Sequence, residues 1–114
     1  MPLLYRRILD AQALSTGDTM DLAEAIDLGE YTVLEITVVV SEAGAGESAA
    51  LLFQHAPCNE AGRYMDFATP LKVDLTHAGT TWEHIDAFTR FLTWSVTGTL
   101  NSSAVATVDI VAKG

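Results

Sequence analysis

The side chains best suited to metal or acid–base chemistry are three histidines and one cysteine. His55 and Cys58 lie three residues apart, whereas His77 and His84 stand alone farther along the chain. A structural zinc site needs imidazole and thiolate ligands at tight, paired spacing, and a second pair is missing here. We therefore expect no metal site, with a half-buried Cys58 after a strand and the histidines at the surface or in loops.

No local pattern marks a catalytic group. There is no GxSxG elbow, Cys58 lacks the surroundings of an activated thiol, and the carboxylates are scattered. The run Gly44–Ala49 matches GxGxxA, but a dinucleotide turn must open a helix, and Pro57 arrives too soon for one. We interpret this run as a hairpin loop, and we expect no cofactor and no enzyme activity.

The two tryptophans differ in their neighbours. Trp94 alternates with Leu92 and Val96, which predicts a core position. Trp82 lies among polar residues, and a partly exposed Trp there would be a candidate for binding a partner or for stacking on a sugar.

Charge excludes one class of partner. Six basic against fifteen acidic residues give a formal charge of -9, and no Lys or Arg occurs between Ile8 and Gly62. Nucleic acid is therefore an unsuitable partner, because phosphate contacts need clustered basic side chains. The acidic half would dock on a basic partner, repel like copies, or simply keep the chain soluble.

Size and composition predict one domain over residues 1–114. The chain is 49% apolar and only 18% charged, which leaves apolar surface for a partner or an oligomer interface. One cysteine allows no internal disulfide, and no apolar run is long enough to span a membrane or serve as a signal peptide. We expect synthesis in the cytoplasm and no membrane partner.

The elements that must position these residues are short strands. Tyr31–Val40 is rich in β-branched residues and predicts a central strand covered on both sides. Period-two alternation or apolar runs predict further strands, separated by turn-forming residues. These strands are Leu3–Leu9, Ala49–His55, Leu71–Thr76, Leu92–Thr97 and Thr107–Ile110. The fold class expected is an all-β antiparallel sandwich, jelly-roll-like, with seven or eight strands.

One segment, Asp18–Leu28, leaves two alternatives open. Met20, Ala23 and Ile26 recur at helical spacing after an Asp that could cap a first turn, which predicts a short helix. The other interpretation is a loop, after which Ile26 and Leu28 join the following strand.

The order of segments from Asp27 onward resembles small β-sandwich structural proteins of tailed phages and prophages, of the head-decoration or tail-associated type. The segments that carry the resemblance are YTVLEITVVV, SEAGAGES, ALLFQHAP, LKVDLT, WEHIDAF, RFLTWSVTG and ATVDIVAKG. The resemblance implies adhesion and assembly, often as homo-oligomers on a repeating shell, and it implies no particular contact residues.

Three hypotheses follow. The first is a non-enzymatic virion component, a capsid decoration or accessory protein that binds the major capsid protein or another virion protein. The second is a carbohydrate-binding or adhesion module that uses Trp82. The third is a small enzyme that uses His55 and Cys58.

Overall fold

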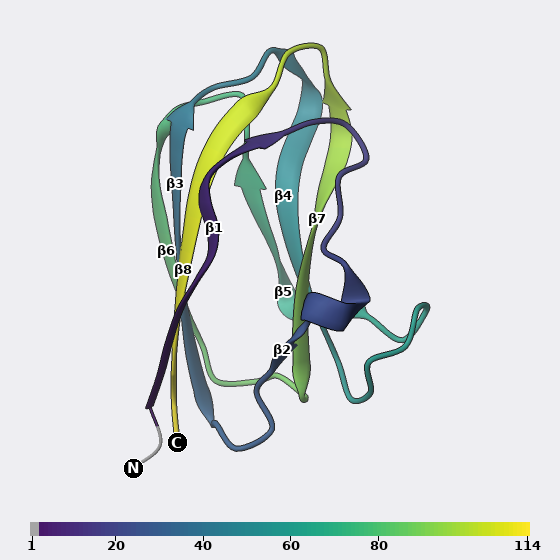
Figure 1. The fold of residues 1–114 in the computed structure, drawn as a ribbon, viewed down its shortest axis with the longest axis vertical. Helices are drawn as coiled ribbons and strands as arrows, with labels where there is room; N and C mark the ends of the chain where they lie inside the picture. Colours follow the sequence, from purple (N-terminus) through teal and green to yellow (C-terminus); the bar gives the residue numbers. More distant parts are fainter. Residues whose placement is uncertain (1–2) are drawn as a thin grey trace.

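The computed structural model describes residues 3–114, which form eight strands in two packed antiparallel sheets (Figure 1). The predicted all-β sandwich is confirmed. The strands are β1 (Leu3–Leu14), β2 (Ile26–Asp27), β3 (Val33–Glu42), β4 (Gly46–Ala56), β5 (Met65–Asp74), β6 (Gly79–Ile85), β7 (Phe91–Leu100) and β8 (Ala104–Lys113).

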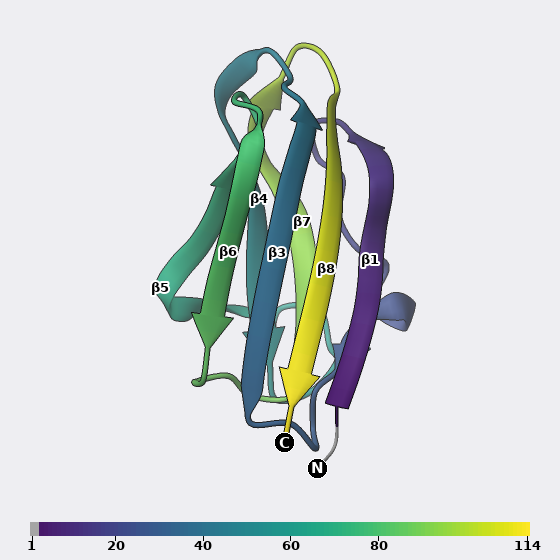
Figure 2. The same ribbon diagram turned by 90° about the vertical axis from the view of Figure 1, so that its left-hand side faces the viewer.

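The strand order is that of an eight-stranded jelly roll. One sheet has the order β1-β8-β3-β6 and the other β2-β7-β4-β5, and every pair is antiparallel. Most successive strands therefore cross from one sheet to the other, as two interleaved Greek keys require. Figure 2 shows the first sheet face-on, with β3 and β8 between the edge strands β6 and β1.

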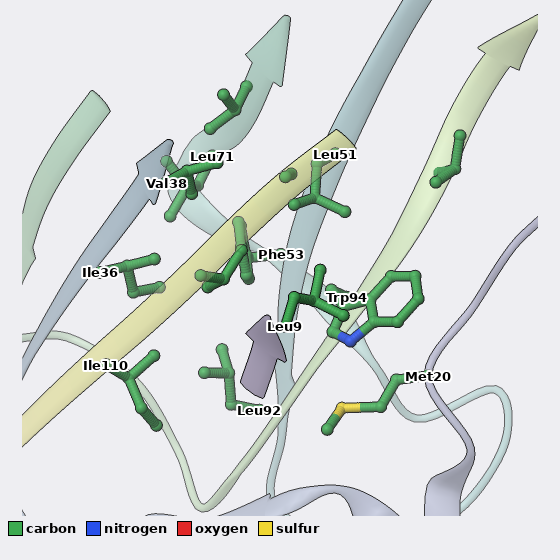
Figure 3. Close-up of a cluster of buried hydrophobic side chains, with 14 of the residues drawn as sticks. Leu9, Met20, Ile36, Val38, Leu51, Phe53, Leu71, Leu92, Trp94 and Ile110 are labelled. Atoms are coloured by element: carbon green, nitrogen blue, oxygen red, sulfur yellow. The ribbon is translucent and has the colours of Figure 1, made fainter. Parts of the chain in front are cut away.

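The core fills the space between the sheets with alternate side chains from each strand (Figure 3). Phe53 is fully buried at the centre, and Trp94 is 9% exposed, which confirms its predicted core position. From β8, the inward residues are small or β-branched: Ala104, Ala106, Val108, Ile110 and Ala112. This alternation leaves the other half of each strand on the outside of the sandwich.

Strand β3 is central, as predicted, because it pairs with both β6 and β8. Leu34, Ile36 and Val38 point into the core. The prediction that its second face is also covered is wrong, since Val39 on that face is 36% exposed. β-Branched residues favour a strand whether or not a second layer covers them, so propensity alone could not separate the two cases.

The segment 18–28 contains the short helical turn that was one of the two alternatives, as one turn of 3₁₀ and not α-helix. A single 3₁₀ turn, η1 (Leu22–Glu24), is capped by Asp21, whose carboxylate accepts from the amide of Ala23. Ala23 is exposed, and Ile26 begins β2, which pairs with β7 rather than joining β3. The helical spacing arose from Met20 and Ile26 facing the core from two separate short segments.

The connection from β3 to β4 is shorter than the predicted turn and is not a hairpin. β3 continues to Glu42 and β4 begins at Gly46, in the opposite sheet. An added Cβ at Gly44 would lie 2.6 Å from the backbone carbonyl oxygen of Ser102, so the crossing needs a residue without a side chain there.

Candidate partner-binding face

The outer surface of the β1-β8-β3-β6 sheet, called the outer face below, is built from every second residue of four strands. Pairing registers place these residues side by side across the sheet. They are Leu3, Tyr5 and Arg7 from β1; Thr107, Asp109, Val111 and Lys113 from β8; Val33, Glu35, Thr37 and Val39 from β3; and Thr80, Trp82 and His84 from β6.

Exposed apolar side chains gather on this face. Within residues 3–114, five large hydrophobic side chains are exposed, and four of them, Leu3, Tyr5, Val39 and Trp82, belong to the outer face. The fifth, Met65, lies on β5 in the other sheet. Exposed apolar residues scattered singly are ordinary, but their collection on one sheet surface is typical of an interaction site.

An ion pair anchors the β1 side of the outer face. Arg7 donates two hydrogen bonds to Asp109, at 2.9 Å from Nε and 3.2 Å from Nη2. The Tyr5 hydroxyl donates to the same carboxylate at 2.8 Å. The Arg7 guanidinium lowers the pKa of Asp109, and the hydrogen bond to that carboxylate raises the pKa of Tyr5. Tyr5 is thereby held against the sheet with its ring exposed.

A second ion cluster lies at the end of the face where β3 begins and β8 ends. Lys113 Nζ donates to Glu35 Oε1 at 3.4 Å, and His84 Nδ1 lies 3.7 Å from the same oxygen. The strands therefore place two basic side chains, Arg7 and Lys113, and two acidic ones, Glu35 and Asp109, on this face. The formal charge of the outer face is therefore zero, although the whole chain carries -9.

Trp82 is the exposed tryptophan of the outer face and lies on the edge strand β6. It is 57% exposed on β6, directly across from Thr37 of β3. Its ring centroid lies 6.2 Å from that of His84, with the two planes tilted by 41°. The exposure that would make Trp82 a binding candidate is therefore present.

His55 is buried, and its expected surface or loop position is wrong. It continues the inward alternation of Leu51 and Phe53 on β4, is 8% exposed, and stacks on Phe67 at 4.7 Å between centroids. Its Nδ1 accepts from the backbone amide of Thr89 at 3.0 Å. Burial lowers the pKa of His55, so the ring is a neutral packing element.

The other candidate ligands are dispersed. Cys58 is half-buried in the loop after β4, as predicted. The exposed His77 contacts Asp74 at 2.6 Å, and His84 lies on the outer face. Within the described part of the chain, no three His, Cys, Asp or Glu side chains are close enough to hold a metal ion.

Two open hollows border the sandwich. One of about 570 Å³ contains Asp27 and Arg90, which already form a two-pronged ion pair at 2.9 and 3.0 Å. The Arg90 guanidinium lowers the pKa of Asp27, and Arg6 and Glu30 also line this hollow. The other hollow, about 320 Å³, lies between the Phe67–Leu71 segment of β5 and residues 83–87, beside the edge of β6.

Sequence reasoning singled out Trp82 and missed Tyr5, Val39 and the Arg7–Asp109 pair. Only the pairing register shows that these residues share one surface, since β1 and β8 lie at opposite ends of the chain. The alternation of polar and apolar residues on β8 was the available signal for Asp109.

A scan against protein-family models and a search of curated proteins both found no match. Among the residues that the structure describes, no helix is long and apolar enough to cross a membrane.

Proposed function

We propose that this chain is a non-catalytic structural subunit of a bacteriophage-type particle, of the capsid decoration or accessory kind. It is made in the bacterial cytoplasm and carried in the virion, where the outer face docks on the major capsid protein or another virion protein. The observation that carries the proposal is that four of the five exposed large hydrophobic side chains of the described residues lie on this one surface.

The charges of the outer face support docking. An unpaired charge is costly to bury, whereas Arg7 and Asp109, like Lys113 and Glu35, enter a contact already paired. The remaining surface carries the excess negative charge, which keeps the free chain soluble and disfavours wrong contacts with acidic proteins.

Repetition supports assembly as the function of such a face. A sheet surface of this size makes a modest interface, but a shell offers many equivalent positions, so the stabilisation is collective. Jelly rolls occur in viral capsid and lectin domains, which agrees with the proposal, although a fold by itself assigns no function. The segment order described above, which resembles phage structural proteins, points the same way.

The test is co-sedimentation of the purified chain with shells assembled from a major capsid protein encoded in the same genome. Val39→Asp places a carboxylate on the outer face between Thr107 of β8 and Thr80 of β6 and should weaken binding by roughly 30-fold or more. The matched control Ala61→Asp adds the same charge on the exposed β4–β5 loop and should bind like the parent. No binding by the parent chain, or equal binding by both variants, would contradict the proposal.

Glycan binding is the second candidate, favoured by the 57% exposure of Trp82 and the neighbouring His84 ring. Because Trp94 is buried, a shift of tryptophan emission on addition of a glycan would report Trp82. Titration with a panel of oligosaccharides should then shift the parent spectrum and leave Trp82→Ala unchanged. A panel that shifts neither spectrum would rule this candidate out.

A further inference from the structure

Three of the four edge strands in this sandwich are protected against pairing with another chain. β1 carries two register shifts and Ala11 at a φ of 46°. β2 is only two residues long, and β5 is interrupted between its pairs at Asp66 and Leu71, a stretch that includes Pro70. Bulges, short length and proline are the devices by which native proteins blunt exposed edges.

The fourth edge strand, β6, has no bulge and no proline and is longer than β2; its inner side carries one charged residue, Glu83. All seven of its residues pair with β3 without a register shift, and the strand contains no Lys, Arg or Pro. In the described chain, the hydrogen bonds outside the strand ladders involve no residue from Gly79 to Ile85. Figure 2 shows β6 as a straight strand at the border of its sheet. Its outward backbone groups are therefore available to another strand.

We propose that β6 pairs antiparallel with β6 of a second copy, so that the two outer sheets join into one continuous eight-stranded sheet. This goes beyond the docking function, because backbone pairing at the edge does not require the outer face to bind a shell. A second copy is the occupant that the sequence of β6 fits, as its register shows.

Only one antiparallel register pairs all seven residues of β6 with all seven of the partner strand. It places Trp82 on the two-fold axis, opposite Trp82 of the second copy, and Thr81 opposite Glu83. Thr80 then faces His84, so no like charges stand directly opposite each other. The two Trp82 rings, each exposed in the single chain, cover one another on the outer side of the joined sheet.

The pairing closes on itself. Each copy has one regular edge, and after pairing the joined sheet ends in the two bulged β1 strands. A two-fold contact of this kind gives a dimer and no open fibre. The charge of -9 on each copy opposes association at long range, so the dimer should tighten as salt screens that repulsion.

Charge substitutions at the axis test the register directly. Trp82→Lys sets two ammonium groups directly across the strand pair, and Trp82→Glu sets two carboxylates there. By sedimentation velocity, the parent should run at twice the 12.2 kDa chain mass, and each variant should dissociate at least about 30 times more readily. An equimolar mixture of the two variants should dimerise again, because only the mixed pair has opposite charges at the axis.

The matched control is Tyr5→Lys, which adds the same charge to an exposed aromatic position on β1, at the far edge of the same face. It should dimerise like the parent. Circular dichroism and melting of each variant keep a folding defect apart from a dissociated dimer. In hydrogen exchange, the β6 amides that point away from β3 should be protected in the parent and should exchange in Trp82→Lys.

The outcomes separate this inference from the proposed function. A monomeric parent, a mixture that fails to re-form dimers, or a Tyr5→Lys variant that dissociates would each overturn the β6 pairing. A dimeric parent that ignores shells would leave the pairing standing and count only against capsid docking.

Discussion

Replacing Gly98 by alanine should be far more damaging than its local sequence suggests. Gly98 has a φ of +74° and lies in β7 opposite the point where the β4–β7 register shifts, between Glu47 and Ala50. A Cβ added there would lie 2.5 Å from the carbonyl carbon of Ser48 and 2.8 Å from the carbonyl oxygen of Glu47. These are backbone atoms of the neighbouring strand, which cannot rotate away.

Two contributions set the magnitude. A left-handed φ costs an alanine about 1–2 kcal/mol, partly offset because alanine also restricts the unfolded chain. Displacing the β4 backbone adds an overpacking cost of about 1–3 kcal/mol. We therefore expect Gly98→Ala to lower the free energy of unfolding by about 3 kcal/mol, a large share of the roughly 5–15 kcal/mol typical of a domain.

Gly62 supplies the matched control. Its φ is +85°, but no atom lies within 4 Å of an added Cβ, so Gly62→Ala carries the backbone strain without the clash. Urea denaturation of the two variants at equal pH, with unchanged m values, measures the difference. The structure predicts that Gly98→Ala is the more destabilising by about 1–3 kcal/mol. Losses equal to within about 0.5 kcal/mol would refute the close approach of β4 and β7 at this bulge.

Three further substitutions follow from the core and the ion pairs. Phe53→Ala, at a fully buried position, should reduce the free energy of unfolding by about 3–5 kcal/mol in chemical denaturation. A loss below about 1 kcal/mol would contradict the burial of Phe53 in the core. Burial lowers the pKa of His55, so near pH 6 the unfolded state binds more protons than the folded state. The stabilisation from the neutral ring is therefore present above about pH 6.5 and is lost as the pH falls. His55→Gln should make the free energy of unfolding depend less on pH between about pH 5 and pH 7. Thr76→Val removes a hydroxyl that donates to Asp74, and NMR titration should show the Asp74 pKa rising from about 2 toward 3.8. An unchanged pKa would mean that this hydrogen bond does not lower the pKa of Asp74.

The sequence predicted the sandwich because its core strands obey a period of two. Leu92, Trp94 and Val96 on β7, like Val108 and Ile110 on β8, alternate cleanly with polar residues and face inward as expected. Such alternation states which side of a strand is buried, and it needs no knowledge of the partner strand.

The site could not be predicted in the same way. β6 was missed because Thr81 and Glu83 occupy its inner side and Thr80 and His84 its outer side, so neither side carries an apolar repeat. Residues 79–85 form a strand because they pair with β3, and the local sequence does not predict it. The outer face depends equally on long-range pairing, since β1 and β8 join residues about a hundred positions apart, a relation that local pattern does not encode.

The most direct test of the account is oxidative footprinting of the chain alone and bound to shells. Two exposed, oxidisable side chains report on it: Tyr5 on the outer face, and Met65 on the other sheet. Because Tyr5 lies on β1, far from the β6 edge, its protection reports docking and not dimerisation. The account predicts that shells protect Tyr5 while Met65 is oxidised as in the free chain. Protection of Met65 with Tyr5 still reactive would place the contact on the opposite sheet and contradict it.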